Sequence, residues 1–291
     1  MIGALVRLAR PHQWVKNGFV FVGWIFSHRW GDTALLGHVL TMFAAFCLAS
    51  SAVYAANDVV DRAADAGHPK KRHRPVASGA LTPGAAAAFS TVLLVAGLAL
   101  AATVSGWGLA MVLAYVALNA GYSAGLKHVV VLDVFIIATG FMLRILAGTL
   151  AVGVPPSQWL LLCGMMVTLF LGFSKRRSEL VLLGAEGGKH RAALDDYTPA
   201  LLDSMITVSA AGVMVTYSLY TVNPATVALH GTDRLILTLP FVLYGMFRYL
   251  FLLHRRGAGS DPAGDLLQDF HLIGAVAGWV VVTAWLLAPS L

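Results

Sequence analysis

Residues 33–65 read TALLGHVLTMFAAFCLASSAVYAANDVVDRAAD and join a long apolar run to a cluster of acids. The run over 33–57 contains no Lys, Arg, Asp or Glu. It exceeds the roughly 20 residues that a helix needs to cross the hydrocarbon core of a bilayer. The first acid, Asp58, follows directly after it. The stretch therefore predicts a membrane-spanning helix that ends in a polar site.

The composition of the whole chain also indicates a membrane protein. Of its 291 residues, 58% are hydrophobic and 12% are charged, whereas a soluble domain is about 45–50% apolar and about 25% charged. So little polar surface excludes an ordinary soluble enzyme, a disordered chain and a nucleic-acid-binding module. The two cysteines, Cys47 and Cys163, exclude a disulfide scaffold.

Nine segments of the chain are long and apolar enough to span a bilayer. Gly and Pro residues separate them, and small residues within them suit close helix packing in lipid. The predicted spans are 14–30, 33–57, 84–104, 107–124, 129–152, 156–182, 201–222, 234–253 and 270–289. We therefore predict an all-α polytopic membrane protein, with a single integral membrane domain over 1–291 and nine transmembrane helices.

The basic residues predict the orientation of these spans. With the N-terminus in the cytoplasm, 16 of the 20 Lys and Arg residues lie on the cytoplasmic side, and only Arg29 and Arg234 lie opposite. Such a bias follows the positive-inside rule, and we expect the protein in the inner (plasma) membrane with its N-terminus and site in the cytoplasm. Most acids lie on the same side, which that rule does not require, so this face also resembles a polar working surface.

The acids that follow the run at 33–57 have helical spacing. Asn57, Asp61 and Asp65 are separated by four residues each and share one helix face, with Asp58 beside them. Carboxylates this close repel one another unless a cation joins them. Hard oxygen ligands suit Mg²⁺, which also bridges to substrate phosphates. We therefore predict that Asp58, Asp61 and Asp65 hold Mg²⁺; the alternative is a solvated helix end.

A basic run follows the acids, and residues 68–75 read HPKKRHRP. Its cations suit phosphate oxygens, so carboxylates for a metal and cations for phosphate stand side by side in the sequence. We predict that Lys70, Arg72 and Arg74 contact a diphosphate or a phosphate of the substrate. The alternative is a charge run that only fixes the orientation of the chain in the membrane.

The pattern N-D-x-x-D-x-x-x-D, followed by H-P-x-K-R-x-R-P, resembles the UbiA prenyltransferase superfamily, and the resemblance covers essentially the whole chain. It implies a UbiA-like bundle with a cavity that opens to the cytoplasm and to lipid. It also implies that the first acidic motif binds Mg²⁺ and the diphosphate of a substrate.

A second acidic motif, roughly D-x-x-x-D, ends the sixth span in that superfamily. Residues 173–179 of this chain read FSKRRSE instead, so that Lys175, Arg176 and Arg177 precede a single acid, Glu179. Lys175 and Glu179 have the i, i+4 spacing of a helical ion pair. The departure argues against ordinary prenyl transfer, because three cations would hold anionic oxygens directly.

Other residues resemble one branch of the superfamily, the decaprenyl-phosphate phosphoribosyltransferases. These are RPHQWVKN at 10–17, Tyr122-Ser123 with Lys127, Leu132-Asp133, GFMLR at 140–144 and the run at 175–179. The resemblance implies 5-phosphoribosyl diphosphate as donor and a polyprenyl phosphate as acceptor, and it is compatible with a homo-oligomer. It implies that Lys175 joins the three acids in catalysis. The residues it places in substrate binding, beyond those of the basic run, are Lys16, Asn57, Tyr122, Lys127, Asp133, Arg144, Arg176, Arg177 and Glu179.

Several residues carry alternative interpretations. Asp133 and Arg144 share a helix face but lie about 16 Å apart, too far to pair directly. An arginine inside a span indicates function by default, although Arg144 can instead satisfy carbonyls or another helix. Tyr122 can be an interfacial aromatic residue. The loop with Asp195-Asp196-Tyr197 is expected to be largely solvated, with a lid as the alternative.

Two other functions compete with phosphoribosyl transfer. One is a prenyltransferase that makes a quinone or haem precursor, against which the missing second acidic motif argues. The other is a transporter for an anionic lipid, which usually shows internal repeats and broken helices at mid-membrane. The sequence shows no repeat, and its acids lie at a membrane edge.

Overall fold

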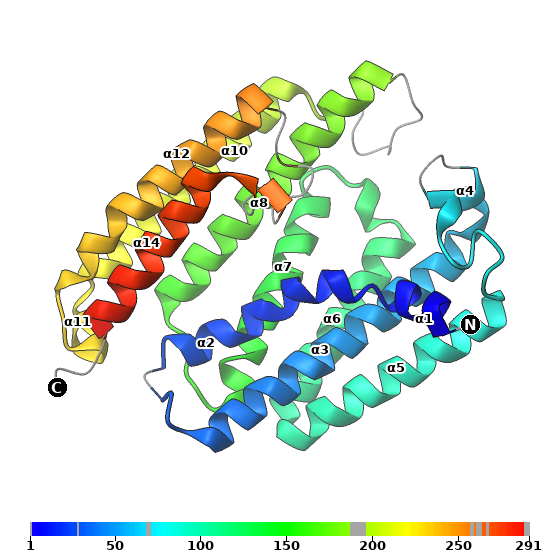
Figure 1. Cartoon of the computed structure of the whole chain (residues 1–291), viewed down its shortest axis with the longest axis horizontal. Coiled ribbons are helices and arrows are strands. Elements are labelled where there is room, and N and C mark those ends of the chain that lie inside the picture. Colours follow the sequence, from blue (N-terminus) through cyan, green and yellow to red (C-terminus); the bar gives the residue numbers. More distant parts are fainter. Residues whose placement is uncertain are drawn as a thin grey trace. The chain divides into compact units, whose positions relative to one another are not determined.

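The computed structural model describes residues 2–27, 29–67, 71–186, 196–256, 259, 264–265 and 268–287, without the side chains of 183–186 and 256. Every regular element in these ranges is helical (Figure 1), which confirms the all-α prediction. The chain forms two compact units: Met1–Leu126 with Thr139–Pro156, and Lys127–Ala138 with Ser157–Leu291. The chain passes between the units three times, and one of these points, between Ala138 and Thr139, falls inside α7 (Leu132–Ala147). The single domain over 1–291 stays a prediction.

Within the described ranges, eight segments are long and apolar enough to cross a membrane. Their bounds agree with eight of the predicted spans to within a few residues. They are α3 (Thr33–Val60), α5 (Pro83–Val104), α6 (Gly106–Ala124), α7 with η4 (Leu150–Val152), α8 (Gln158–Glu186), α10 (Pro199–Val222), η5 (Arg234–Thr238) with α12 (Leu239–Arg256), and α14 (Phe270–Leu287).

The predicted first span at 14–30 has a different form, so the count of nine is not confirmed. The chain there forms a 3₁₀ helix, η1 (Pro11–Phe21), followed by the short α2 (Val22–Ile25). The preceding helix α1 (Ile2–Ala9) ends at Arg10, whose φ of 52° is left-handed, and Pro11 opens η1. Trp14 donates a hydrogen bond to the Ser51 hydroxyl of α3 at 3.0 Å, so η1 is fixed by polar contacts to α3.

In the first unit, α3 is the central helix, with α5 running beside it (Figure 1). Its inward face buries Val39, Met42 and Phe46 completely. Gly97 of α5 lies so close to α3 that an added Cβ would sit 3.0 Å from the Ala45 carbonyl oxygen. Small residues at helix contacts allow this approach, because association in lipid depends on close packing.

In the second unit, α8 packs along α10, and α12 packs along α14. Leu202 and Ile206 of α10 and Leu253 of α12 are fully buried in its core. The ring of Phe170 on α8 meets that of Tyr249 edge-on, with ring centroids 5.2 Å apart. This core holds the C-terminal half of α8, with its basic run, against its neighbours.

Polar caps determine where several spans begin. The side chains of Asp32, Thr82, Ser105 and Thr198 each accept a hydrogen bond from the backbone N–H three residues later. Each bond satisfies one of the N–H groups that a helix leaves without an internal partner. The bond from Leu35 also lowers the pKa of the Asp32 carboxyl.

A substitution at Gly148 tests how closely η1 approaches the end of α7. A Cβ at this position would lie 1.7 Å from the Val20 carbonyl oxygen, so Gly148→Ala must displace backbone. We expect a loss of about 1–3 kcal/mol in stability, measured by thermal unfolding in detergent. Gly37→Ala on the exposed face of α3 is the control, since its Cβ meets nothing within 4 Å. Equal melting temperatures for the two variants would contradict this packing.

Candidate active site

The acidic motif lies where α3 ends. The helix stops at Val60, Asp61 adopts a turn conformation, and the short α4 (Arg62–Ala66) follows. Backbone N–H groups of Asp61 and Asp65 still donate to the carbonyls of Asn57 and Asp61, both at 2.8 Å. The four-residue spacing predicted from the sequence is therefore kept across the end of α3.

Two of the three acids are buried and held by arginines. Asp58 and Asp65 are 1% and 2% exposed. Arg10 Nη2 lies 2.6 Å from Asp58 Oδ1, and Arg74 Nη1 lies 3.2 Å from the same oxygen. Arg74 Nη1 also lies 2.7 Å from Asp65 Oδ2. The two carboxylates therefore share one guanidinium, which offsets the repulsion between them.

Arg10 comes from the break between α1 and η1, and its guanidinium lies 5.1 Å from the ring centre of Tyr54 on α3. Arg10 belongs to the RPHQWVKN stretch at 10–17, but it was not predicted to be a binding residue. The sequence feature that could have indicated its role is the pair Arg10-Pro11, because proline is favoured at the first position of a helix and so marks where the next helix begins. The charge pattern alone does not reveal that this arginine reaches Asp58, 48 positions away.

The other predicted residues of this unit differ in their surroundings. Asn57 accepts a hydrogen bond from Ser123 of α6 at 3.0 Å, which brings the ends of α3 and α6 together, and Tyr122 is the neighbour of that serine. Lys16 on η1 is half-buried. Arg72, in η2 (Lys71–His73), is exposed. Lys70 lies outside the described residues.

The donor set at the end of α3 fits a divalent cation in its chemistry. Asp58 Oδ2 is buried and accepts no hydrogen bond from the described residues. A buried carboxylate oxygen without a donor is costly unless a cation satisfies it, and carboxylate oxygens are preferred ligands of Mg²⁺. Among the described residues, no three His, Cys, Asp or Glu side chains converge as a ready-made ligand set. Arg74 contacts both Asp58 and Asp65.

Arg144 is a buried cation within the first unit. Its guanidinium donates to the Asn17 side-chain oxygen at 2.7 Å, the Gly140 carbonyl at 2.6 Å and the Tyr115 hydroxyl at 3.2 Å. The rings of Tyr115 and Phe46 lie 4.7 and 5.7 Å from the guanidinium carbon. These contacts match the interpretation in which Arg144 satisfies a carbonyl and another helix, and substrate binding by Arg144 stays a prediction.

The second unit contains a network around Asp133 of α7, which is fully buried. Asp133 Oδ2 accepts from Arg176 Nε at 2.6 Å, and Oδ1 accepts from the Tyr197 hydroxyl at 2.9 Å. Arg176 also forms an ion pair with Glu179. The i, i+4 spacing made Lys175 a possible partner of Glu179, but the ion pair forms with the buried Arg176 one helical turn before Glu179. Lys175 is half-buried.

Tyr197 is a residue that the sequence analysis missed. It is 3% exposed, whereas its loop was expected to be largely solvated, and its neighbour Asp196 is exposed. Asp195 lies outside the described residues. The Tyr197 hydroxyl also accepts from the Val131 N–H at 2.7 Å, and Val131 has a φ of 68°, which is uncommon for a branched residue. Burial raises the pKa of Tyr197, so its hydroxyl stays protonated as a donor to Asp133.

The remaining predicted cations are more accessible than Arg176. Arg177 is 15% exposed and pairs with Asp203 of α10, which is itself 35% exposed. Lys127, in η3 (Leu126–His128), is half-buried. The basic run at 175–177 therefore divides into one buried residue and two that solvent reaches.

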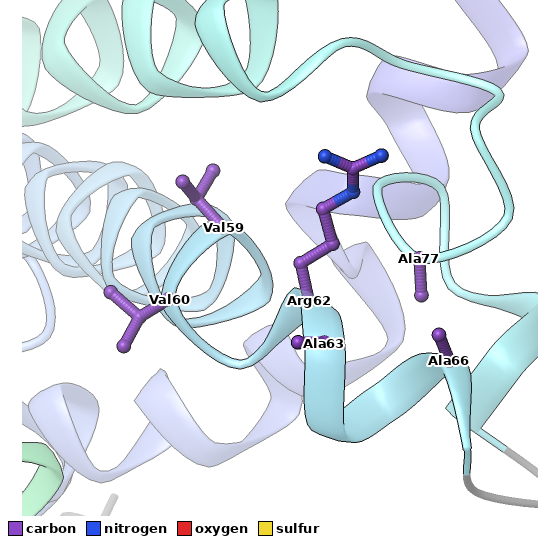
Figure 2. A pocket seen from close by; sticks show the side chains of 6 residues that line it. All are labelled: Val59, Val60, Arg62, Ala63, Ala66 and Ala77. Atoms are coloured by element: carbon purple, nitrogen blue, oxygen red, sulfur yellow. The ribbon is translucent and has the colours of Figure 1, made fainter.

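A pocket of about 430 Å³ lies beside the acidic motif, and Arg62 extends between the end of α3 and the loop that carries Ala77 (Figure 2). Its lining residues are Val59, Val60, Arg62, Ala63, Ala66 and Ala77. None of the predicted metal ligands lines it, so this pocket is a mainly apolar neighbour of the motif. The cytoplasm-facing cavity stays a prediction.

These features define a multi-pass helical membrane protein with an acidic motif in one unit and a basic run in the other. Residues 18–264 match the UbiA prenyltransferase family, and the chain therefore belongs to it.

Relatives and solved structures agree with this family. The chain is 34% identical to a decaprenyl-phosphate phosphoribosyltransferase from Corynebacterium glutamicum over 97% of this chain and 84% of the relative. It is 34% identical to one from Mycobacterium tuberculosis over 96% of this chain and 93% of the relative. The structure of a UbiA homologue from Archaeoglobus fulgidus bound to DMAPP and Mg²⁺ aligns with a TM-score of 0.71 at 17% identity, covering 98% of this chain and 96% of that one.

The pair of Asp133 and Arg176 is open to a double-mutant cycle. Arg176→Met leaves a buried carboxylate without its cation, which costs about 3–5 kcal/mol. We expect the double variant Asp133→Leu with Arg176→Met to unfold at a higher temperature in detergent than Arg176→Met alone.

The control for this cycle is Arg177→Met, whose partner is partly exposed, with an expected loss below about 1 kcal/mol. Additive losses in the double variant would contradict a coupled buried pair.

Proposed function

We propose that this protein is a membrane glycosyltransferase that moves 5-phosphoribose from phosphoribosyl diphosphate to a polyprenyl (decaprenyl) phosphate and releases diphosphate. One observation carries the proposal: α8 has Lys-Arg-Arg-Ser-Glu at 175–179, where the superfamily resemblance leads one to expect a second acidic motif. The near full-length similarity to decaprenyl-phosphate phosphoribosyltransferases supports it. A polyprenyl-linked pentose of this kind fits a role in cell-wall arabinan synthesis.

The reaction suits the residues at the end of α3. The acceptor phosphate is an anion at neutral pH, so its oxygen attacks C1 of the ribose without a strong general base. Asp58, Asp61 and Asp65 would hold Mg²⁺, which stabilises the negative charge on the departing diphosphate. The transition state is oxocarbenium-like, and a single displacement inverts the anomeric carbon.

The cations would bind the phosphates of the two substrates. Lys175 and Arg177 are reached by solvent, as are Arg72, Lys127 and Lys16, and each can donate to phosphate oxygens. Arg176, Asp133 and Glu179 satisfy one another and would position the run at 175–177. We also propose the inner (plasma) membrane as the location, with the N-terminus and the site in the cytoplasm, as the basic residues indicate.

A second candidate is prenyl transfer to an aromatic acceptor. It is favoured by the fold shared with a UbiA homologue whose structure contains DMAPP and Mg²⁺. Buried Asp58 and Asp65 are equally suited to a prenyl diphosphate, so the first acidic motif alone does not separate the two reactions. The basic end of α8 favours the first.

The assay that separates them uses purified protein, Mg²⁺, radiolabelled phosphoribosyl diphosphate and a polyprenyl phosphate. We expect labelled lipid to form, to be abolished by chelation of divalent cations, and to return when Mg²⁺ is added back. Product from prenyl diphosphate and an aromatic acceptor, with no labelled lipid, would replace the proposal with its alternative.

Asp61 is the most informative acid to change, because it is half-buried and pairs with neither Arg10 nor Arg74. Asp61→Asn therefore removes a charge without breaking either ion pair, and we expect turnover to fall about a hundredfold or more while the melting temperature stays within a few degrees. The control is Asp233→Asn, an exposed acid outside the motif, which should retain activity. Full activity in Asp61→Asn would remove Asp61 from the metal site.

A further inference from the structure

Arg10 and Arg74 bind one oxygen on each of the two buried carboxylates that are predicted to hold a divalent cation, while Asp58 Oδ2 has no donor among the described residues. Both guanidiniums contact Asp58 Oδ1, at 2.6 and 3.2 Å, and Arg74 also contacts Asp65 Oδ2 at 2.7 Å. The carboxylates are nearly inaccessible, whereas the side chains of Arg10 and Arg74 are 23% and 25% exposed. The arginines, and not the acids, therefore form the solvent-facing side of the cluster.

The contact of Arg10 depends on an unusual backbone. Its φ of 52° and ψ of 59° are left-handed, a conformation that residues other than glycine rarely adopt. Such a conformation persists where surrounding contacts determine it. Here the ion pair with Asp58 and the Tyr54 ring hold the side chain in place. Release of Asp58 would therefore free Arg10 from one of its two restraints.

A guanidinium and a divalent cation compete for the same carboxylate oxygen, because both are positively charged and repel each other at such short range. A divalent cation that takes Asp58 Oδ1 therefore competes with both arginines, and one that takes Asp65 Oδ2 competes with Arg74. The displaced guanidiniums lose a charge-assisted hydrogen bond unless another anion accepts them. Diphosphate oxygens are such acceptors, because guanidinium binds phosphate in the same two-pronged geometry as carboxylate.

We propose that Arg10 and Arg74 couple metal binding to diphosphate binding by exchanging their carboxylate partners for diphosphate oxygens. Metal alone binds weakly, because it competes with the guanidiniums. Diphosphate alone also binds weakly, because the guanidiniums are already paired. Together they bind tightly, and the coupling is reciprocal. This inference rests on the proposed function only in taking the acidic motif as a diphosphate site.

The test measures Mn²⁺ and inorganic diphosphate on the purified full-length protein in detergent, each alone and together, by calorimetry and by Mn²⁺ electron paramagnetic resonance. The solution complex of the two ligands is subtracted. For the unchanged protein we expect diphosphate to raise the affinity for Mn²⁺ at least about tenfold, a typical coupling between two ligands. In Arg74→Gln we expect Mn²⁺ alone to bind about tenfold more tightly and the coupling to fall well below that of the unchanged protein, with Arg10 supplying the remainder.

The control is Arg62→Gln, which removes the same charge from an exposed arginine on α4. Loss of any nearby cation favours metal and disfavours anions, so the control measures this general effect. We expect it to change each affinity less than about threefold and to leave the coupling intact. Equal effects of Arg62→Gln and Arg74→Gln, or full coupling in Arg74→Gln, would overturn the proposal.

Arg74→Gln leaves Asp58 and Asp65 with less neutralising charge, so we expect the substitution to lower the melting temperature of the protein. The proposal then predicts that Mn²⁺ raises the melting temperature of this variant more than that of the unchanged protein. An equal or smaller rise would contradict it. Arg10→Gln, which leaves Arg74 in place, should lower the coupling without abolishing it, and unchanged coupling would exclude Arg10.

These outcomes are separate from those of the transfer assay. Coupled binding of Mn²⁺ and diphosphate, with no transfer from phosphoribosyl diphosphate, would contradict the proposed function and leave the exchange standing. Transfer that proceeds in a protein without coupling would contradict the exchange alone.

Discussion

Asp58 is a carboxylate that is 1% exposed at the end of a membrane-spanning helix, and the first unit is built around its neutralisation. A buried charge is tolerated only when it is paired and hydrogen-bonded. Arg10 meets this need from the break between α1 and η1, and Arg74 meets it from the turn after η2. The break between α1 and η1 and the segment after α4 therefore each place an arginine against this one carboxylate.

The second unit also pairs a buried aspartate with an arginine, but the result is different. Asp133 uses both of its oxygens, one with Arg176 and one with Tyr197. Asp58 leaves Oδ2 without a donor among the described residues. Satisfied networks make buried polar groups rigid, whereas an unsatisfied oxygen is available to a ligand. The two aspartates therefore suit two roles: Asp133 a fixed support, and Asp58 a ligand.

Hydropathy and residue spacing predicted the eight confirmed spans and the acidic motif, because both are local properties of the sequence. The first span differed because a left-handed Arg10, Pro11 and side-chain bonds to α3 outweigh apolar composition there. The contacts of Arg10 and Tyr197 with buried aspartates were not predicted, because those partners lie 48 and 64 positions away. Pairing at that range depends on tertiary packing, which no single sequence pattern encodes. For Glu179, the i, i+4 spacing pointed to Lys175, whereas the partner is Arg176.

The order of the chain gives the acidic cluster a further property. Arg10, Asp58, Asp65 and Arg74 all precede Pro83, where α5 begins. During synthesis, Arg10 exists before Asp58 does, and the complete cluster exists before the next long helix is made. The end of α3 can therefore enter the headgroup region of a membrane as a nearly neutral assembly, long before the basic run of α8 leaves the ribosome.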